Sequence, residues 1–162
     1  QGKESHPVVN VSWEDAQVYC EWLSRLTHQE IRLPTEIEWE KAARGAKDKR
    51  IYPWGDRFDA MRCNTYELGL RDTTPVGIFQ NGASPYGCLD MLGNVWEWCL
   101  DWFDEEEQKF RVLRGGAWIN FRDFARCSSR YWDLPYRWAN CIGFRVLAAP
   151  ISEFLNSGFL ES

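Results

Sequence analysis

Residues 111–149 read RVLRGGAWINFRDFARCSSRYWDLPYRWANCIGFRVLAA, and the two ends of this stretch carry the clearest strand signals in the chain. RVLRGGAW and IGFRVLAA are bounded by glycine and rich in β-forming residues, so we expect both to be strands. The segment between them follows neither the alternation of a strand nor the 3.6-residue period of a helix. A long aperiodic segment inside a compact domain indicates either function or disorder. Its many Trp, Tyr and Phe side chains argue against disorder, because disordered segments are poor in aromatic residues.

Two short helices are predicted before this stretch. Residues 12–26 and 36–44 space their apolar side chains at helical intervals. Each begins with a capping box, in which a hydroxyl residue and an acidic residue three positions later satisfy each other's backbone N–H groups. The two boxes are Ser12 with Asp15 and Thr35 with Glu38. From residue 51 onward, Gly, Pro, Asn and Asp separate short apolar runs, which predicts loops and short strands.

Length and composition favour one globular domain. The 162 residues are 44% hydrophobic and contain no internal repeat, low-complexity tract or linker, so we assign residues 1–162 to a single domain. The tail, residues 150–162, is either a docked short helix or a frayed end. Ten Trp residues exceed what a minimal core needs and favour a recognition surface.

Charge and hydropathy narrow the classes of partner. A net charge of -5 makes nucleic acid an unlikely ligand, because nucleic-acid binders carry clustered basic surfaces. The acidic run at 104–107 is interpreted as a solvated loop. No stretch has the roughly 20 apolar residues of a membrane span, and the first residues lack the features of a signal peptide, so we expect a soluble chain of unassigned location.

The cysteines leave the redox compartment open. The six cysteines form no C-x-x-C pair and the chain has only two His, so a structural zinc site is improbable. An even number of cysteines permits disulfides, but buried free thiols are equally reasonable in a chain of this length.

Seven motifs in order resemble the formylglycine-generating-enzyme (sulfatase-modifying-factor) family over residues 6–149. They are HPVVNVSW (6–13), RLPTEIEWEKAARG (32–45), YPWG (52–55), TPVG (74–77), GNVWEW (93–98), RGGAW (114–118) and GFRV (143–146). The resemblance implies an α+β, irregular C-type-lectin-like fold with two short helices, short antiparallel strands and much loop. Family members usually carry a further part before the HPV motif, so this chain is either a compact variant or lacks part of the usual domain.

The resemblance also implies where catalytic chemistry would lie. The family's oxidases hold copper with two cysteines five residues apart after the GG motif, since Cu(I) prefers paired thiolates. Counted back from GFR, the second position is Cys127 but the first is Arg122, which is not a thiolate ligand. We therefore expect no copper site unless Cys141 supplies the second thiolate. A packed or solvent-facing thiol is the plainer interpretation of Cys127.

The segment 111–146 is similar to the variable region of another subgroup, the variable proteins of diversity-generating retroelements. In that subgroup a framework stays fixed while other positions are diversified. The framework positions here are Arg114, Gly115, Gly116, Trp118, Arg126, Arg130, Gly143, Phe144 and Arg145. The candidate ligand-binding residues are Ile119, Phe121, Asp123, Phe124, Ser129, Tyr131, Trp132, Leu134, Tyr136, Trp138 and Ala139.

Physical reasoning about this segment gives two alternatives. A loop fixed at both ends by strands and internally by arginines can hold exposed rings rigidly, which lowers the entropic cost of binding. The same aromatics could instead form a second core, an interpretation that suits Trp118 best. Phe144 is assigned to the core.

The resemblance also implies a structural Ca²⁺, an ion that prefers oxygen ligands. The first candidate site combines the carboxylates of Asp90 and Glu97 with the carbonyls of Gly93 and Val95. The alternative is that Asp90 caps a turn and Glu97 pairs with an arginine. A second candidate site consists of Asn64, the Thr65 carbonyl and Glu67.

Three functions remain in competition. The first is a non-catalytic display domain whose aromatic segment binds a protein or other macromolecular ligand. The second is a copper-dependent oxidase that converts a cysteine in a peptide to formylglycine. The third is a structural or regulatory domain of a larger protein. The sequence favours the first, because only one cysteine of the expected pair is present.

Overall fold

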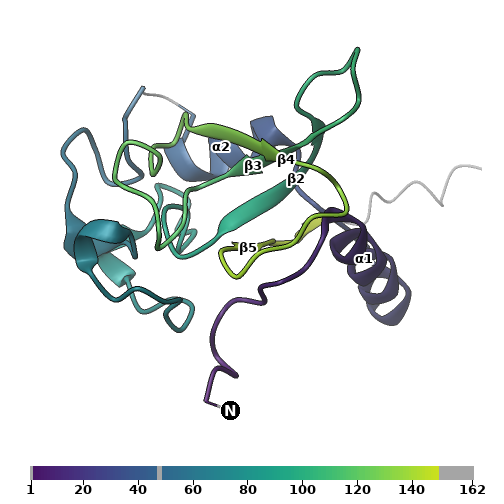
Figure 1. Cartoon of the computed structure of the whole chain (residues 1–162), viewed down its shortest axis with the longest axis horizontal. Helices are drawn as coiled ribbons and strands as arrows, with labels where there is room; N and C mark the ends of the chain where they lie inside the picture. Colours follow the sequence, from purple (N-terminus) through teal and green to yellow (C-terminus); the bar gives the residue numbers. More distant parts are fainter. Residues whose placement is uncertain (1, 47–48, 150–162) are drawn as a thin grey trace, which may run out of the picture.

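The computed structural model describes residues 2–46 and 49–149, and the predicted tail at 150–162 lies outside the described residues. Figure 1 shows a small central sheet with α1 at one end of the molecule and long loops at the other. The helices are α1 (Trp13–Thr27) and α2 (Glu36–Arg44), with three short 3₁₀ turns at Ala60–Arg62, Tyr66–Leu68 and Gln80–Gly82. The strands are β1 (Glu30–Arg32), β2 (Trp96–Trp102), β3 (Arg111–Arg114), β4 (Arg130–Asp133), β5 (Ile142–Gly143) and β6 (Leu147–Ala149).

Both predicted helices are present, and both capping boxes are formed. The Ser12 hydroxyl accepts the backbone N–H of Asp15 at 3.0 Å, and the Asp15 carboxylate accepts the backbone N–H of Ser12. Thr35 and Glu38 repeat this arrangement at the start of α2. These reciprocal bonds satisfy N–H groups that have no partner inside a helix, so they fix where each helix begins.

The strands form two sheets. The larger has the order β4-β3-β2-β5, with antiparallel pairing except between β2 and β5, which are parallel. The smaller pairs β1 with β6 antiparallel. After the loop region the chain passes through β5 in the large sheet and then pairs with β1 through β6. This α+β arrangement with much loop confirms the expected C-type-lectin-like class.

Two strand predictions need correction. IGFRVLAA is not one strand, because residues 144–146 separate β5 from β6 and the two pieces join different sheets. The longest strand, β2, was not predicted as one. Its first four residues, Trp96 to Cys99, are all buried, so the sequence lacks the apolar and polar alternation of a half-exposed strand.

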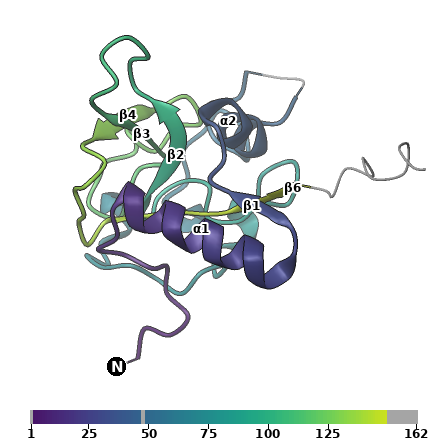
Figure 2. The same cartoon turned by 90° about the vertical axis from the view of Figure 1, so that its right-hand side faces the viewer.

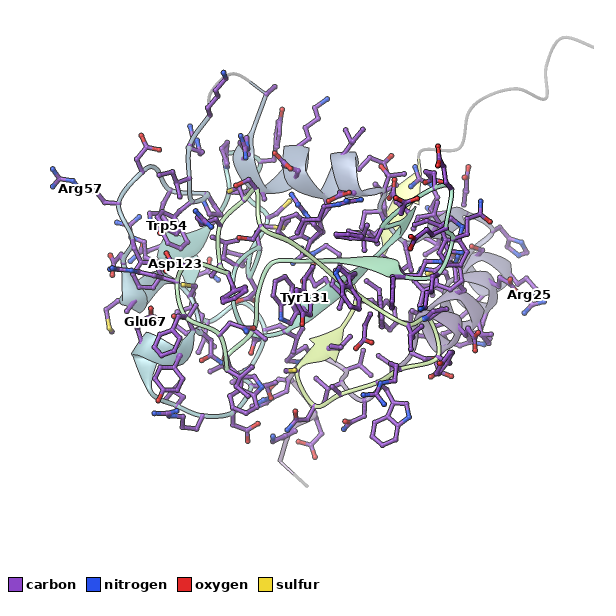
Figure 3. All side chains as sticks on the ribbon, turned by 45° about the horizontal axis from the view of Figure 1, so that its top comes forward. Arg25, Trp54, Arg57, Glu67, Asp123 and Tyr131 are labelled. Atoms are coloured by element: carbon purple, nitrogen blue, oxygen red, sulfur yellow. The ribbon has the colours of Figure 1, made fainter. Side chains whose placement is uncertain are left out.

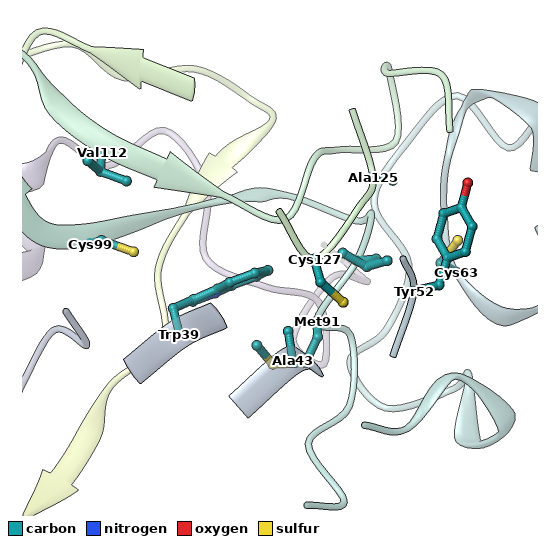
Figure 4. Packing of buried hydrophobic residues seen from close by; sticks show 10 residues of the cluster. Trp39, Ala43, Tyr52, Cys63, Met91, Cys99, Val112, Ala125 and Cys127 are labelled. Carbon is teal, nitrogen blue, oxygen red and sulfur yellow. The ribbon is translucent and has the colours of Figure 1, made fainter. Parts of the chain in front are cut away.

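The core consists of two clusters on opposite faces of the large sheet. Successive residues of a strand point to opposite faces. Accordingly Cys99 and Val112 join one cluster, whereas Trp98 and Leu113 join the other. Helix α2 covers the first cluster through Trp39 and Ala43, which Figure 4 shows with their neighbours, and α1 covers the second through Ala16 and Cys20. Within the described residues, no helix is long and apolar enough to cross a membrane.

Candidate ligand-binding surface

The aromatic segment, defined here as residues 119–139, is held at several points along its backbone. The Tyr66 N–H donates to the carbonyl of Asn120 at 2.9 Å, and the Cys127 N–H donates to the carbonyl of Ile51 at 2.9 Å. Residues 130–133 pair with β3 as the edge strand β4. Near the far end, the Trp13 N–H donates to the Pro135 carbonyl at 3.0 Å. Four separate parts of the domain therefore fix the path of this segment.

Arg114 joins the segment to α2 from within the core. Its side chain is 1% exposed, and it donates to the carbonyl of Cys127 and the carboxylate of Glu40, both at 2.6 Å. It also pairs with Glu36, which in turn pairs with the framework residue Arg130 at 2.8 Å. A guanidinium can make these bonds at once because its donors form a rigid fork. The predicted internal fixation by arginine is thus present.

None of the eleven predicted ligand-binding side chains is buried. Eight are exposed: Ile119, Phe121, Asp123, Phe124, Tyr131, Trp132, Tyr136 and Trp138. Ser129, Leu134 and Ala139 are half-buried, and Ala139 packs against the cluster under α1. The alternative of a second core therefore does not describe the segment as a whole. Two framework rings differ from the rest, because Trp118 is half-buried and Phe144 packs on the edge of the core without being fully buried.

The middle of the surface is a row of contacting rings. Tyr131 stacks on Trp96 with ring centroids 5.3 Å apart, and Trp132 packs against Phe110 at 4.1 Å. Arg130 lies over the ring of Phe103 at 4.1 Å. Figure 3 shows Tyr131 near the centre of this face. Such ring contacts contribute about 0.5–1.5 kcal/mol each beyond burial, so they hold the exposed rings in place.

The loop end of the surface includes residues that the sequence did not predict. Phe121 packs on the Tyr66 ring with centroids 4.3 Å apart. The guanidinium of Arg71 lies over the same Tyr66 ring, 3.8 Å from its centroid. A hollow of about 600 Å³ is lined by Trp54, residues 56–60 and Arg62. Figure 3 shows Trp54, Asp123 and Glu67 on the same side of the molecule. Tyr66 and Arg71 lie in no motif, so only the tertiary structure reveals them.

The cysteine positions do not fit a copper pair. Cys127 is fully buried, and Figure 4 shows it within the cluster that contains Met91 and Ala43. Burial raises the pKa of its thiol to about 12, so the thiolate is scarce at neutral pH. Arg122 at the other position is exposed. Cys141 packs on the cluster across the sheet from Cys127, so these two thiols face opposite sides.

At the first predicted calcium site, protein groups already surround the oxygen atoms. The Glu97 carboxylate accepts Nε1–H of Trp39 at 2.6 Å and Nη2–H of Arg145 at 2.7 Å. Arg145 also donates to the carbonyls of Leu89 and Asp90, while the Asp90 carboxylate accepts the Gly77 N–H. The contact between Glu97 and Arg145 matches the alternative to a calcium site, in which Glu97 pairs with an arginine. Burial raises the pKa of Asp90, so its charged form has lost solvation that the Gly77 N–H and the Arg145 guanidinium only partly replace.

The second predicted site has a free oxygen. Asn64 is 0% exposed and its amide nitrogen donates to the Asp72 carbonyl, but its Oδ1 has no hydrogen-bond partner among the described residues. The Thr65 carbonyl accepts the Leu68 N–H, and Glu67 accepts the Arg122 N–H at 2.9 Å. A buried acceptor without a partner costs free energy, so this position suits an oxygen-coordinated cation better than the first. Both calcium sites remain predictions.

Residues 1–150 match the model of the sulfatase-modifying factor enzyme 1-like domain. The inactive C-alpha-formylglycine-generating enzyme 2 of Bos taurus is 39% identical over 158 residues, which cover 88% of this chain and 50% of that protein. The formylglycine-generating enzyme of Mus musculus is 34% identical over 175 residues, covering 90% and 45%. The chain therefore spans about half the length of these relatives, and they include both a protein named inactive and a named enzyme.

Among solved structures, the Treponema denticola variable protein 1 superposes with a TM-score of 0.85. The similarity covers 93% of this chain and 73% of that protein, at 24% sequence identity. At this identity the match establishes the shared fold alone.

Proposed function

The chain belongs to the sulfatase-modifying factor enzyme 1-like domain family, and on that premise we propose that it is a non-catalytic binding module of this family. In this proposal the aromatic segment binds a protein or other macromolecular ligand. The diversification of residues 111–146 is part of the same proposal. It predicts a reverse-transcriptase gene and an adenine-rich near-copy of this coding segment in the neighbouring DNA.

One observation carries the proposal. Seven large apolar side chains are exposed within residues 119–138, on a backbone that Arg114 and bonds from several other parts of the domain hold in place. Exposed apolar side chains that contact one another mark interaction sites. A backbone that is already ordered loses little entropy on binding, so the contact energy of the rings is retained as affinity.

The oxidase is disfavoured by the residues at the expected positions. Arg122 and the buried Cys127 do not form a thiolate pair. We expect native protein at pH 8 to show no alkylation of Cys127 by iodoacetamide, with urea-unfolded protein as the reactive control. Rapid modification of Cys127 in the folded state, together with turnover of a cysteine peptide, would restore the oxidase.

The binding proposal is tested with a random-peptide display library and two triple variants. The first variant changes Tyr131, Tyr136 and Trp138 to Ala. The control changes Val76, Ile78 and Tyr86 to Ala, because these side chains are similarly exposed, at 57%, 51% and 55%, but lie outside the surface. We expect wild-type and control protein to enrich the same peptides and the first variant to lose them.

Two outcomes oppose the proposal. Peptides that bind both triple variants equally would place the binding surface elsewhere, and a wild-type domain that enriches none would remove the binding role. If the first variant unfolds instead, the rings belong to the core. A thermal melt of each variant separates that outcome from a loss of binding.

We also propose that Asn64 Oδ1, the Thr65 carbonyl and Glu67 hold a structural Ca²⁺. Its support is the unpartnered buried oxygen of Asn64. A cation that binds only the folded state raises its stability in proportion to the logarithm of concentration, by about 2.7 kcal/mol at 100 times the dissociation constant. We expect the melting temperature to rise with millimolar CaCl2 but not with MgCl2. An identical melt in EDTA and in calcium would refute this site.

A further inference from the structure

Helix α1 has an exposed apolar side in addition to its buried one. Ala16 and Cys20 face the core. Tyr19, Trp22 and Leu26 do not, and they are 43%, 50% and 62% exposed. Figure 2 shows α1 lying across the front of the molecule, where no other described element covers it. A surface helix is normally polar on the side away from its core, so this apolar side needs an explanation beyond the fold.

The exposed apolar residues of α1 lie on one stripe that begins at a carboxylate. Along the stripe, intervals of four, three and four residues separate Asp15, Tyr19, Trp22 and Leu26. Side chains at these intervals lie on one line along a helix. Tyr19 packs against Trp22 with ring centroids 5.5 Å apart and against Phe144 at 5.4 Å, so these contacts order the stripe.

A hollow lies beside the stripe at the first half of α1. It has a volume of about 440 Å³ and is lined by Val8, Val11, Asp15, Tyr19, Phe144 and Val146. Of these six side chains, five are aliphatic or aromatic and only Asp15 carries a charge. An exposed apolar hollow of this kind is suited to an apolar group of a ligand. The hollow and the stripe together form one surface, which we call the α1 face.

The carboxylate of Asp15 stays charged at the edge of the hollow. It accepts the backbone N–H of Ser12 at 2.9 Å and the Ser12 hydroxyl at 2.7 Å, and these bonds lower the pKa of the Asp15 carboxyl. No cation of the residues that the structure describes forms an ion pair with Asp15. A ligand with an apolar body and a cationic group complements both the hollow and this carboxylate.

The remaining charges of α1 favour the same kind of ligand. Glu14 and Glu21 are exposed, and Arg25 is the one basic residue of the helix, so α1 exposes three acids against one base. Such an excess attracts a basic partner and repels an acidic one. It therefore disfavours a second copy of α1 and an anionic membrane, because each would bring like charges together.

We propose that the α1 face binds a basic amphipathic helix of a partner protein. In this complex the apolar residues of the partner lie on the stripe and enter the hollow, while a Lys or Arg of the partner lies beside Asp15. An amphipathic helix on an apolar groove is a common form of recognition, with anchor residues spaced by three and four as on this stripe. The α1 face is a second binding surface, additional to the aromatic segment.

Synthetic helices of defined composition test the proposal on the full 162-residue chain. Helix α1 has 15 residues, so a peptide of about 18 residues covers its length. The first peptide has Leu on one side and Lys on the other, and the second has Glu in place of Lys. The third has the composition of the first in an order without an apolar side. In fluorescence anisotropy, the first peptide should bind at least about tenfold more tightly than either of the others.

Substitutions in the stripe test where the Leu–Lys peptide binds. Trp22→Lys should raise its dissociation constant at least about 30-fold, because the change removes a central aromatic anchor and adds a repelling charge. Leu26→Lys should act in the same direction. Ile37→Lys is the matched control, because it makes the same change of charge at a 79% exposed apolar residue of α2, and it should leave binding unchanged. Circular dichroism should show all three variants folded.

A matched pair of double variants tests the acidic residues beside the stripe. Glu14→Gln with Glu21→Gln should weaken binding of the Leu–Lys peptide about threefold. Glu106→Gln with Glu107→Gln is the control, since it changes the net charge equally at exposed residues outside α1, and it should have no effect. An equal loss in both double variants would show that the peptide follows the net charge of the chain and not the α1 face.

Asp15→Asn tests the carboxylate at the hollow. The Asn side-chain oxygen can still accept the Ser12 N–H, so the change removes the charge and keeps an acceptor for the capping bond. We expect binding of the Leu–Lys peptide to weaken about fivefold at low salt and the difference from wild type to shrink with added salt. A thermal melt shows whether the helix start is preserved. Unchanged affinity at low salt would contradict the predicted contact between Asp15 and a cation.

Other results also overturn the proposal. Equal binding of the Leu–Lys and Leu–Glu peptides, or no binding of the Leu–Lys peptide, excludes a basic partner helix. Binding that Trp22→Lys leaves unchanged lies on another surface. A monomer–dimer equilibrium in sedimentation that Trp22→Lys abolishes would assign the α1 face to a second copy.

The triple variant of Tyr131, Tyr136 and Trp138 separates this surface from the aromatic segment. It should bind the Leu–Lys peptide as wild type does, even though it loses the peptides selected from the display library. Failure of one binding proposal is therefore distinguishable from failure of the other. Loss of Leu–Lys binding in a folded triple variant would place this peptide on the aromatic segment and overturn the proposal for α1.

Discussion

The core of the sheet and the aromatic segment use the same large rings in different ways. Trp98 is 0% exposed and its indole N–H donates to the Val11 carbonyl at 3.1 Å. Trp138 is 64% exposed and, in the described part of the chain, has neither a ring contact nor a hydrogen bond. The comparison shows that the number of tryptophans in a sequence does not tell which of them are buried. The position of the backbone decides this, because β2 is buried on both faces and the segment after β4 runs over the surface.

The largest effect is expected from Trp98→Ala. The substitution removes a buried indole between α1 and the sheet and leaves a cavity, so we expect a loss of about 3–5 kcal/mol in the free energy of unfolding. Urea denaturation followed by far-UV circular dichroism measures it. Trp98→Phe keeps most of the volume and should cost less. A loss below about 1 kcal/mol for Trp98→Ala would show that this part of the core collapses around the missing ring.

A smaller effect is expected where the two regions meet, at Arg114. Arg114→Met removes the donors that reach Glu36, Glu40 and the Cys127 carbonyl, leaving acceptors without partners. We expect a loss of about 2–3 kcal/mol, in the range for breaking a buried charged hydrogen bond. The second consequence is local: hydrogen exchange measured by mass spectrometry should accelerate in peptides covering residues 119–130.

Arg137→Met is the control for Arg114, since Arg137 is exposed and no ion pair of the described residues includes it. It should change neither the free energy of unfolding nor the exchange rates. Destabilisation by Arg114→Met without faster exchange in the segment would mean that Arg114 supports α2 alone. Arg114 would then not connect the core to the aromatic segment.

The sequence predicts local structure well where the signal is local. Both capping boxes determine helix starts through contacts three residues apart, so Ser12 and Thr35 could be identified without tertiary information. Strand β2 could not, because the burial of consecutive residues removes the alternation on which strand prediction depends. The splitting of IGFRVLAA into β5 and β6 likewise reflects pairing with β2 and β1, which are distant in sequence.

The candidate surface also has a part that the local sequence predicts and a part that depends on tertiary contacts. The absence of periodicity in residues 119–139 indicated side chains outside the core, and the exposure of Tyr131 and Trp138 agrees with that expectation. The contribution of Tyr66 and Arg71 arises from a loop about 50 residues earlier, and nothing in its local pattern signals contact with Phe121. The pairing of Glu97 with Arg145 spans a similar distance, and the sequence could offer it only as an alternative to calcium.

Helix α2 supports both regions, and its N-terminus makes their stability sensitive to acid. Glu38 accepts two bonds from Arg32 at 2.7 Å and caps Thr35, and these contacts lower the pKa of its carboxyl from 4.5 to about 2. A carboxyl with a lowered folded-state pKa contributes stability above its unfolded pKa and loses it as pH falls toward the folded value. Stability should therefore decrease between about pH 5 and pH 2.

Glu38→Gln tests this contribution. We expect it to lower the free energy of unfolding at pH 7 by about 1 kcal/mol, a value reduced for solvent screening because the pair is partly exposed. The difference from wild type should shrink as the pH approaches 2. Urea denaturation at four pH values measures it, with Glu105→Gln as the control in the exposed turn at 104–107. A difference that is constant with pH would assign the effect to lost packing instead of charge.

The smallest effect on stability is expected from Trp138→Ala, and it completes the comparison with Trp98. Trp138 is mostly exposed and has no ring contact or hydrogen bond with the described residues, so the free energy of unfolding should stay within about 0.5 kcal/mol of wild type. Its proposed role predicts the opposite in binding, where removal of a rigid exposed ring should weaken a selected peptide ligand by at least tenfold. Denaturation and peptide titration on the same preparation separate the two. A destabilisation similar to that of Trp98→Ala would place Trp138 in a core, whereas unchanged stability with unchanged binding would move the ligand away from residues 136–138 and toward Phe121 and Tyr66.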